Sequence, residues 1–443
     1  MELKIHVLVP LLGFIFCLFL AAYRFRAAFY ILNLVVFVLL GWISFQLHPG
    51  PAEFNIGDKA GFEAGGRIAS HPEKKYGFYY FNLDADRLIA GSQRLKGQEL
   101  PVKASSDVEL ARDDFIQVSG QYTQGQFLAQ KVAVKGDCFD LYGIRKRTYS
   151  CLSSTYYTYL DYKYGAMCEA FILGNRSHIG DNIKQIFSDS GIYHILAISG
   201  LHISVLLYIF LFLFRRTRWM LILVMLILAF FNFLVGLKAT LLRASVMMVS
   251  AAMSQSWGRP YSKTGVFFTA YSVLLLVVPS FFTDLGFWLS FICIAAILFI
   301  FPLLLQLCPL SRNYLIKAVI LSFSIVVATF PLNAYFFGLV TWTSLISNIL
   351  ILPIFYLLMI VLLLVSFIIL IWPPLGGPLL IMAKPLLYYM EKVAYYVGRI
   401  SVLKWEFADF PRFWITIYYV LLFFLLLLLY KYLIEKDKHG PKG

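Results

Sequence analysis

The sequence predicts a polytopic α-helical membrane protein, with about ten transmembrane helices and one small β-rich domain outside the membrane. Hydrophobic residues make up 60% of the 443 residues and aromatic residues 17%. The mean hydropathy is +0.75. These values exclude a soluble globular protein of this size. Long apolar runs recur along the chain, and one stretch before them has a strand-like pattern instead.

Each apolar run of about 18 residues or more is long enough to cross a bilayer as a helix. Such runs lie near 6–22, 27–46, 191–214, 219–237, 240–257, 265–281, 286–308, 315–338, 344–371 and 413–433. The run at 344–371 contains Pro353, so it is either one tilted helix or a re-entrant segment followed by a span. A weaker run at 378–400 contains charged residues and is equally typical of an interfacial amphipathic helix.

The runs divide the chain into four parts. We expect an N-terminal transmembrane hairpin at 1–47, an external β domain with its connector at 48–165, a transmembrane bundle at 166–433 and a basic tail at 434–443. Arg24 and Arg26 lie in the turn of the hairpin, which places that turn in the cytoplasm and residues 48–165 outside. The side of the membrane that holds the C-terminus stays open.

The net charge of +14 does not come from the external domain. Residues 48–165 contain 15 Lys and Arg against 14 Asp and Glu. The excess flanks apolar runs, as in the RRTR turn at 215–218 and the GRPYSK turn at 258–263. Much of the charge therefore reflects membrane topology rather than a nucleic-acid surface.

Residues 55–140 predict about five short strands in a small barrel or roll of the oligonucleotide/oligosaccharide-binding (OB) type, because apolar and polar residues alternate between turn residues. Basic and aromatic side chains meet at one end of this pattern and are candidates for DNA contact: Lys74, Lys75, Tyr76, Phe78 and Tyr80. Aromatic rings stack on bases and Lys contacts phosphates. The alternative is that every second aromatic residue is simply core.

The connector after the barrel is also basic and aromatic. Arg145, Lys146 and Arg147 precede a run of tyrosines, a composition that suits either a headgroup belt or a strand of nucleic acid. Of the six cysteines, Cys138 and Cys151 are spaced for a structural disulfide in an oxidising compartment.

The stretch Gly191–Ser204 places polar groups in an apolar run. His194, Ser199 and His202 lie within a length that could span a bilayer, and on one helix all three would face one lumen. The alternative is that His and Ser join neighbouring helices while Gly191 and Gly200 permit close backbone approach.

Further polar residues lie at membrane depth and are candidates to line a pathway: Arg243, Asp284, Ser290, Asn333 and Asn348. A buried Arg is costly without a carboxylate, carbonyls, water or a polyanion. We expect Arg243 either to pair with Asp284 or to line that pathway.

Motifs for several activities are absent from the sequence. The seven histidines form no HExxH or HxHxDH cluster, and there is no CxxC and no GxxxxGK[ST]. We therefore expect no metal, no cofactor and no nucleotide hydrolysis by this chain. An intramembrane serine hydrolase, with Ser199 as nucleophile and His194 or His202 as base, is a weaker alternative because all three would share one helix.

Five ordered blocks resemble a known family. They are similar to the ComEC competence family of DNA-uptake channels. The blocks are AFILGNR at 170–176, HILAISGLHIS at 194–204, LLRASVM at 241–247, DLGFWLSF at 284–291 and SNILILP at 347–353. The similarity covers roughly 165–371, and LAISGLH is its most specific part.

The resemblance implies a channel in the bacterial inner membrane that imports single-stranded DNA during natural transformation. It further implies an external DNA receptor and a cytoplasmic ATP-driven translocase or helicase. Whether the lumen lies within one subunit or between two copies of the chain, as a homo-oligomer, stays open. Many family members continue into a metallo-β-lactamase-like domain, whose HxHxDH motif is missing here. A separate nuclease is therefore expected if one strand is degraded. The alternative function is transport of another small or envelope metabolite.

Overall fold

The computed structural model describes residues 61–439, apart from short gaps at 76–77, 91–92, 96–97, 106–109, 111, 113, 124–125, 136–140, 214–219, 237, 257–261 and 309–312. The hairpin expected at 1–47, Tyr76 and Cys138 lie outside the described residues. The chain divides into two compact units. One contains the described residues up to Ile179 together with Val365–Pro378, and the other contains Gly180–Leu364 and Leu379–Gly443.

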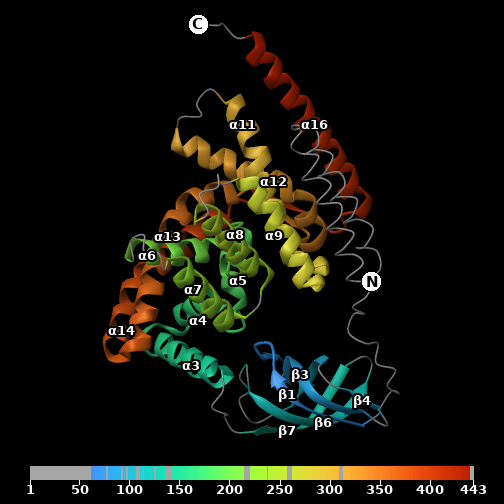
Figure 1. Cartoon of the computed structure of the whole chain (residues 1–443), viewed down its shortest axis with the longest axis vertical. Helices are drawn as coiled ribbons and strands as arrows, with labels where there is room; N and C mark the ends of the chain where they lie inside the picture. Colours follow the sequence, from blue (N-terminus) through green and yellow to red (C-terminus); the bar gives the residue numbers. More distant parts are fainter. Residues whose placement is uncertain are drawn as a thin grey trace. The chain divides into compact units, whose positions relative to one another are not determined.

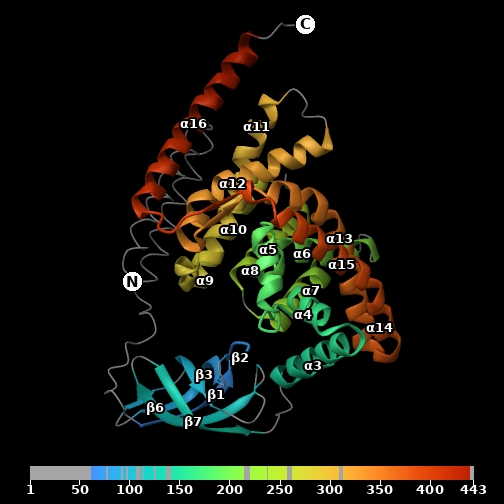
Figure 2. The ribbon, with the colours of Figure 1, turned by 180° about the vertical axis from the view of Figure 1, so that it is seen from behind.

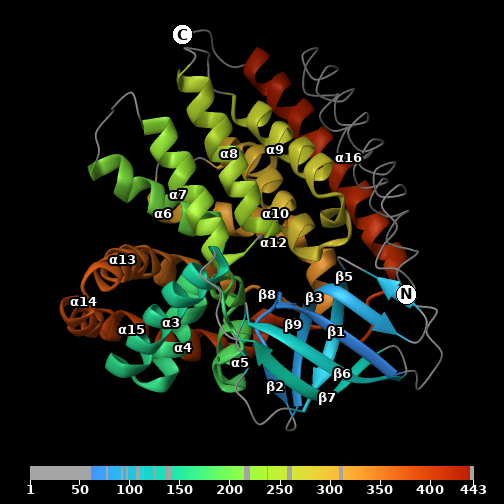
Figure 3. The ribbon, with the colours of Figure 1, turned by 60° about the horizontal axis from the view of Figure 1, so that its bottom comes forward.

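The first unit contains a closed β-barrel (Figures 1 and 3). Its strands are β1 (Gly61–Ile68), β2 (Glu73–Lys75), β3 (Phe78–Ala90), β4 (Gln93–Leu95), β5 (Gln98–Ala104), β6 (Phe115–Thr123) and β7 (Gln126–Lys135). The order is β1-β6-β7-β5-β3, and β3 pairs back with β1 to close the barrel. Only β5 and β7 are parallel in this ring. Side chains alternate between solvent and a core that includes Phe62, Leu83, Leu100, Ile116 and Phe127.

Two glycines bend the barrel strands at bulges. The pairing register shifts at Gly66 in β1 and at Gly120 in β6. A Cβ on Gly66 would lie 2.0 Å from the carbonyl oxygen of Asp84, and one on Gly120 would lie 1.9 Å from that of Leu128. The backbones approach too closely for any side chain, as is common where a barrel strand turns a corner.

Substitution of Gly66 therefore tests the barrel. We expect Gly66→Ala to destabilise it by about 1–3 kcal/mol or more, since the new methyl group meets fixed backbone. The neighbouring Gly65→Ala is the control, because its Cβ meets only Gln117 Cγ at 3.6 Å, an ordinary contact. Protease sensitivity of residues 61–135 in the full chain measures the effect. Equal sensitivity of the two variants would contradict the assignment.

The barrel is followed by a helical hairpin in the same unit, formed by α3 (Leu141–Tyr159) and α4 (Tyr162–Leu173). The end of α13 and α14 (Pro373–Leu379) complete the unit. There the buried Tyr156 hydroxyl lies 2.6 Å from Ser366 Oγ. Cys151, one half of the predicted Cys138–Cys151 disulfide, lies within α3; because Cys138 lies outside the described residues, this pairing stays a prediction.

The second unit is helical. Its elements are α5 (Asp181–Asp189), η1 (Tyr193–Leu196), α6 (Gly200–Leu213), α7 (Met220–Val235), α8 (Ala239–Ser256), α9 (Lys263–Val277), η2 (Pro279–Thr283), α10 (Leu285–Ala295), the π-turn η3 (Ala296–Ile300), α11 (Phe301–Leu307), α12 (Tyr314–Phe337), β8 (Leu339–Thr341), α13 (Ser344–Ile371), η4 (Leu380–Ala383), α15 (Lys384–Gly398), η5 (Ser401–Leu403), β9 (Lys404–Glu406) and α16 (Arg412–His439). The strands β8 and β9 pair antiparallel.

Four helical segments in the described part of the chain are long and apolar enough to cross a membrane: Leu285–Leu307, Tyr314–Phe337, Ser344–Ile371 and Arg412–Glu435. Three shorter apolar helices are Ile222–Val235, Ala239–Met253 and Lys263–Val277. The expected count of ten is not reached among these residues. The run at 344–371 is one continuous helix despite Pro353, which resolves the alternative left open by the sequence.

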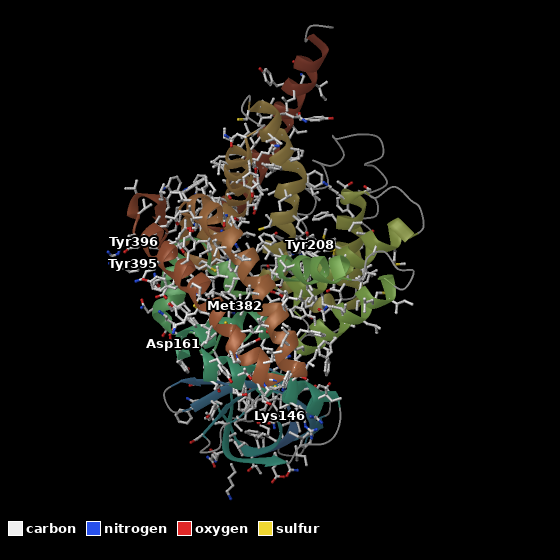
Figure 4. All side chains as sticks on the ribbon, turned by 90° about the vertical axis from the view of Figure 1, so that its left-hand side faces the viewer. Lys146, Asp161, Tyr208, Met382, Tyr395 and Tyr396 are labelled. Atoms are coloured by element: carbon white, nitrogen blue, oxygen red, sulfur yellow. The ribbon has the colours of Figure 1, made fainter. Side chains whose placement is uncertain are left out.

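The weak run at 378–400 contains a short amphipathic helix. Leu387, Met390, Ala394 and Val397 of α15 are buried, and α15 packs on α5 (Figure 2). Its opposite face exposes tyrosines, among them Tyr396 (Figure 4). At 15 residues α15 is too short to span a bilayer, so the interfacial interpretation fits better than a span.

Candidate functional site

Two side chains of the motif LAISGLH, Ser199 and His202, cap the first turn of α6. Ser199 precedes the helix, and its Oγ accepts a hydrogen bond from the Leu201 N–H at 3.3 Å. His202 Nδ1 in turn accepts from the Ser199 N–H at 3.1 Å. This reciprocal arrangement is a capping box with His in the place usually taken by Glu or Gln. His202 is completely buried, and its ring packs against Phe355 with centroids 5.6 Å apart.

His194 does not belong to this helix. It lies on η1, and Ala197 after it is extended, with φ −93° and ψ 135°. The side chain of His194 is exposed. The expectation of one helix through 191–214 is therefore wrong: Gly191 has φ +74°, and the Ser199 cap starts a new helix at Gly200. The structure brings Ser199 and His202 together but places His194 on a separate turn.

The N-terminal end of α8 packs on this turn. Thr240 Oγ1 donates to the Ile198 carbonyl at 2.9 Å. Arg243, one turn further along α8, is buried, and its Nη2 lies 3.4 Å from the position that a Cβ on Gly200 would take. The glycine thus provides room for the guanidinium beside the α6 backbone.

The start of α13 holds the segment that precedes η1. Ser347 Oγ donates to the Ser190 carbonyl at 2.8 Å, and Thr343 Oγ1 donates to the Asp189 carbonyl at 3.0 Å. Both hydroxyl side chains are fully buried. Lys404 Nζ lies 2.9 Å from Asp189 Oδ2, and this ion pair also holds the end of α5 in place. The blocks at 188–204 and 341–355 are therefore one packed region.

The other predicted pathway residues are placed differently. Asn348 Nδ2 donates to Ser322 Oγ on α12 at 3.1 Å. Asp284 Oδ1 accepts from the Gly286 N–H at 2.7 Å and caps α10, so the suggested pairing with Arg243 is wrong. Ser290 is half-buried on α10, and Asn333 Nδ2 donates to Thr329 Oγ1 on its own helix at 3.2 Å. No hydrogen bond or ion pair among the described residues joins these last three to the α6 turn.

The barrel carries an aromatic and basic surface on β3 and β5. Phe78 is exposed and Tyr80 half-buried, while Tyr79 and Phe81 between and beyond them belong to the core. Lys103 Nζ lies 4.4 Å from the Phe78 ring centroid and 5.5 Å from that of Tyr80. The sequence did not single out Lys103, because it reaches these rings only through the β3–β5 pairing. Lys74 and Lys75 lie on β2, paired with β3.

A second basic cluster joins β1 to the start of α3. The Arg67 and Arg145 guanidiniums lie 4.6 Å and 5.3 Å from the ring centroid of Tyr142, which is exposed. Burial, with a further contribution from the neighbouring Arg112 and Arg67, lowers the pKa of Arg145 to about 10. Like charges thus gather around one tyrosine.

The other two basic residues of the predicted trio differ. Lys146 Nζ lies 2.8 Å from Asp114 Oδ1, next to the barrel (Figure 4). Arg147 is exposed on α3. Arg145 shares the cluster at Tyr142.

Sequence reasoning missed a buried carboxylate in the α3–α4 hairpin. Glu169 has no exposed surface. Its oxygens accept from the hydroxyl groups of Tyr149 and Tyr157, from Asn175 Nδ2 at 3.0 Å, and lie 2.8 Å from His178 Nδ1. Burial alone would raise the pKa of Glu169, but the hydrogen bonds from His178, Tyr149 and Tyr157 outweigh it and lower the pKa to about 2. A lone acid in the apolar stretch AMCEAFIL was the available signal.

The comparison with protein families decides the identity of the helical part. The family model described as Competence protein matches residues 171–432, which is more than half of the chain. The chain belongs to the Competence protein family. This confirms the resemblance drawn from the sequence blocks.

Three curated proteins from bacteria are similar in sequence to parts of this chain. The uncharacterized protein YcaI of Escherichia coli (strain K12) is 27% identical over 281 residues, which is 60% of this chain and 36% of that protein. ComE operon protein 3 of Bacillus subtilis (strain 168) is 34% identical over 128 residues, or 28% and 16% of the two chains. An uncharacterized protein of Aquifex aeolicus (strain VF5) is 27% identical over 168 residues, or 38% and 39%. The matches span well under half the length of each relative. No solved structure matches the chain.

The region matched by the Competence family contains the α6, α8 and α13 contacts described above. It begins at Phe171, after Glu169 and after the barrel. The capping box at Ser199 and His202, the buried Arg243 and the α13 hydroxyl groups are therefore features of the family region of this membrane protein, whereas the basic and aromatic surfaces lie before it.

Proposed function

We propose that this chain forms a channel in the inner membrane of a bacterium and passes single-stranded DNA inward during natural transformation. Membership of the Competence protein family is the observation that carries the proposal. The name of its relative ComE operon protein 3 is consistent with such a role. The surfaces of the barrel and the polar groups of the helical unit give the proposal its chemistry.

The barrel is proposed to be of the OB type and to receive the strand. Its five ring strands follow one another as β1, β3, β5, β7 and β6 around the barrel, with the β5–β7 pair parallel. Phe78 and Tyr80, with Lys103 against both rings, offer stacking faces beside a cation. Three further residues remain predicted DNA contacts from the sequence: Lys74, Lys75 and Tyr76.

The cluster at Tyr142 is proposed to contact phosphates. Arg67 and Arg145 both stack on this exposed ring, and guanidiniums held close together favour an anion. A base could stack on Tyr142 while the strand's phosphates meet the arginines. Lys146 and Arg147 extend the basic side of α3.

In the helical unit, we propose that Ser199, His202, Arg243 and Asn348 border the pathway, with His194, Asp284, Ser290 and Asn333 as further predicted contacts. A conduit must release what it binds, so sparse polar groups suit passage of a polyanion better than a wall of lysines. We propose no hydrolytic role for Ser199. His202 Nδ1, the ring nitrogen nearest to Ser199 Oγ, already accepts a hydrogen bond from the Ser199 backbone N–H.

The proposed partners follow from this function. Single-stranded DNA would arrive from an external receptor, and an ATP-driven translocase or helicase in the cytoplasm would pull it, since the sequence contains no nucleotide-binding loop. A separate nuclease and a second copy of the chain complete the proposed assembly.

Uptake of labelled DNA into a nuclease-protected cytoplasmic fraction tests the function. Wild type, a deletion of the gene and the complemented deletion are compared. We expect the deletion to leave DNA bound outside but not internalised, and complementation to restore entry. Unchanged internalisation in the deletion would overturn the proposal and favour transport of a small or envelope metabolite.

Binding of a dT oligonucleotide by the purified full chain tests the barrel surface. We expect Phe78→Ala and Tyr80→Ala each to weaken binding about 10-fold or more, because each removes a stacking face worth about 1–3 kcal/mol per base. Ile89→Ala is the matched control, since Ile89 is an exposed apolar residue on the same strand. Losses of the same size in all three variants would argue against stacking. Affinity should also fall as salt rises.

A further inference from the structure

Arg243 is a buried charge whose surroundings are apolar. Only 7% of its surface is exposed. Its Nη1 has the Met247 sulfur at 4.0 Å, and its guanidinium lies 5.9 Å from the Phe291 ring centroid. Its Nε has no hydrogen-bond partner among the described residues. A guanidinium removed from water is costly unless an anion or several acceptors compensate it.

Asp284, which the sequence suggested as a counter-ion for Arg243, has a different role in the structure. Asp284 accepts the Gly286 N–H and caps α10. Within the part of the chain that the structure describes, no acidic side chain forms an ion pair with Arg243. The fold therefore keeps a positive charge in an apolar place without an internal counter-ion.

The neighbour of this charge is also positive. The guanidinium lies against Gly200, the first residue of α6, where Nη2 is 3.4 Å from the position of an added Cβ. The N-terminus of a 14-residue helix carries partial positive charge, while the Leu201 and His202 N–H groups of this turn already bond to Ser199. Two positive groups therefore lie next to each other at Gly200, an arrangement that an anion bound beside them would stabilise.

We propose that Arg243 and the first turn of α6 form a binding site for a phosphate oxyanion, and that its ligand in the cell is a phosphodiester of the transported strand. This proposal rests on the proposed function and assigns the Arg243 part of the pathway a defined chemistry. The guanidinium fork supplies paired donors suited to two phosphate oxygens. A single such site between apolar walls holds one phosphate briefly and lets the strand move on.

Thermal unfolding of the purified full chain in the presence of inorganic phosphate tests the site, with chloride at equal ionic strength as reference. We expect phosphate to raise the Tm of the wild type by about 1.5 °C near ten times its Kd. Arg243→Gln should abolish the rise. Lys317→Gln, which removes one exposed charge from α12, should keep it. No rise in the wild type, or an equal rise in Arg243→Gln, would overturn the site.

A second variant keeps the test valid if Arg243→Gln does not fold. Gly200→Ala leaves the arginine in place, but its methyl group meets Arg243 Nη2 and Ala244 Cβ at 3.4 Å each. We expect the phosphate affinity of Gly200→Ala to fall several-fold, and an unchanged affinity would contradict the placement of the ligand.

The dinucleotide dTpdT, with thymidine as its control, separates the two sources of phosphate. Competition by dTpdT but not by thymidine supports a phosphodiester of the strand. Arg243-dependent phosphate binding without competition by dTpdT would overturn the assignment to the strand. Failure of DNA entry in the gene deletion is scored separately, so the site and the proposed function can fail independently.

Discussion

Replacement of Glu169 by Gln is expected to loosen the α3–α4 hairpin strongly. The carboxylate accepts from two tyrosine hydroxyls, an asparagine and His178. An amide offers one oxygen where the carboxylate offers two, and its NH₂ group faces donors. The buried donors left without an acceptor then cost about 3 kcal/mol, within the range for charge-assisted hydrogen bonds.

Amide hydrogen exchange in the reconstituted full chain measures this effect. A loss of about 3 kcal/mol should speed exchange in α3 and α4 by about 100-fold. Asp161→Asn is the matched control: it neutralises an exposed acid at the start of α4 whose side chain makes no capping bond (Figure 4). Exchange as slow in Glu169→Gln as in Asp161→Asn would show that the network does not stabilise the hairpin.

The same network predicts a dependence on pH. The pKa of Glu169 falls from 4.5 to about 2 on folding, a difference equivalent to about 3 kcal/mol. Because the folded pKa is the lower one, the stabilisation is complete above pH 4.5 and is lost as the pH falls towards 2. The difference in exchange rate between wild type and Glu169→Gln should therefore be constant near neutrality and shrink under strong acid. A difference that persists at pH 2 would assign the effect to packing instead.

The long helices were predictable because their signal is local. The runs near 286–308, 315–338, 344–371 and 413–433 correspond to the four long helices, since apolar length alone decides whether a segment can cross a bilayer. The run at 191–214 failed for an equally local reason. Its hydropathy is uniform, so the break at Gly191 and the cap at Ser199 do not show in an apolar count.

Contacts that depend on the fold could not be predicted in the same way. Lys103 meets Phe78 only because β3 and β5 pair, and Arg67 meets Tyr142 only because α3 begins beside β1. Charge composition had made the external domain look neutral, yet the fold gathers Arg67, Arg112 and Arg145 in one place. The pairing of Arg243 with Asp284 failed because an Asp directly before a helix caps that helix first.

Replacement of His202 separates a structural role from a role in the pathway. His202→Ala removes the acceptor of the Ser199 N–H and the ring that packs on Phe355. The lost cap and the resulting cavity should together destabilise the start of α6 by about 2–4 kcal/mol. His202→Gln restores an acceptor at the position where Gln completes a capping box, so it should cost less than about 1 kcal/mol. His194→Ala, on the exposed η1 turn, should change little.

Hydrogen exchange of α6 and DNA entry in the complemented deletion are read together in these variants. If His202→Gln restores both, the ring serves to position the α6 turn, and the pathway depends on the helix start and Arg243. If it restores slow exchange but not entry, the imidazole itself takes part in passage. Exchange in His202→Gln as fast as in His202→Ala would refute the capping box, because Gln keeps the hydrogen-bond acceptor and also fills most of the space that Ala leaves empty.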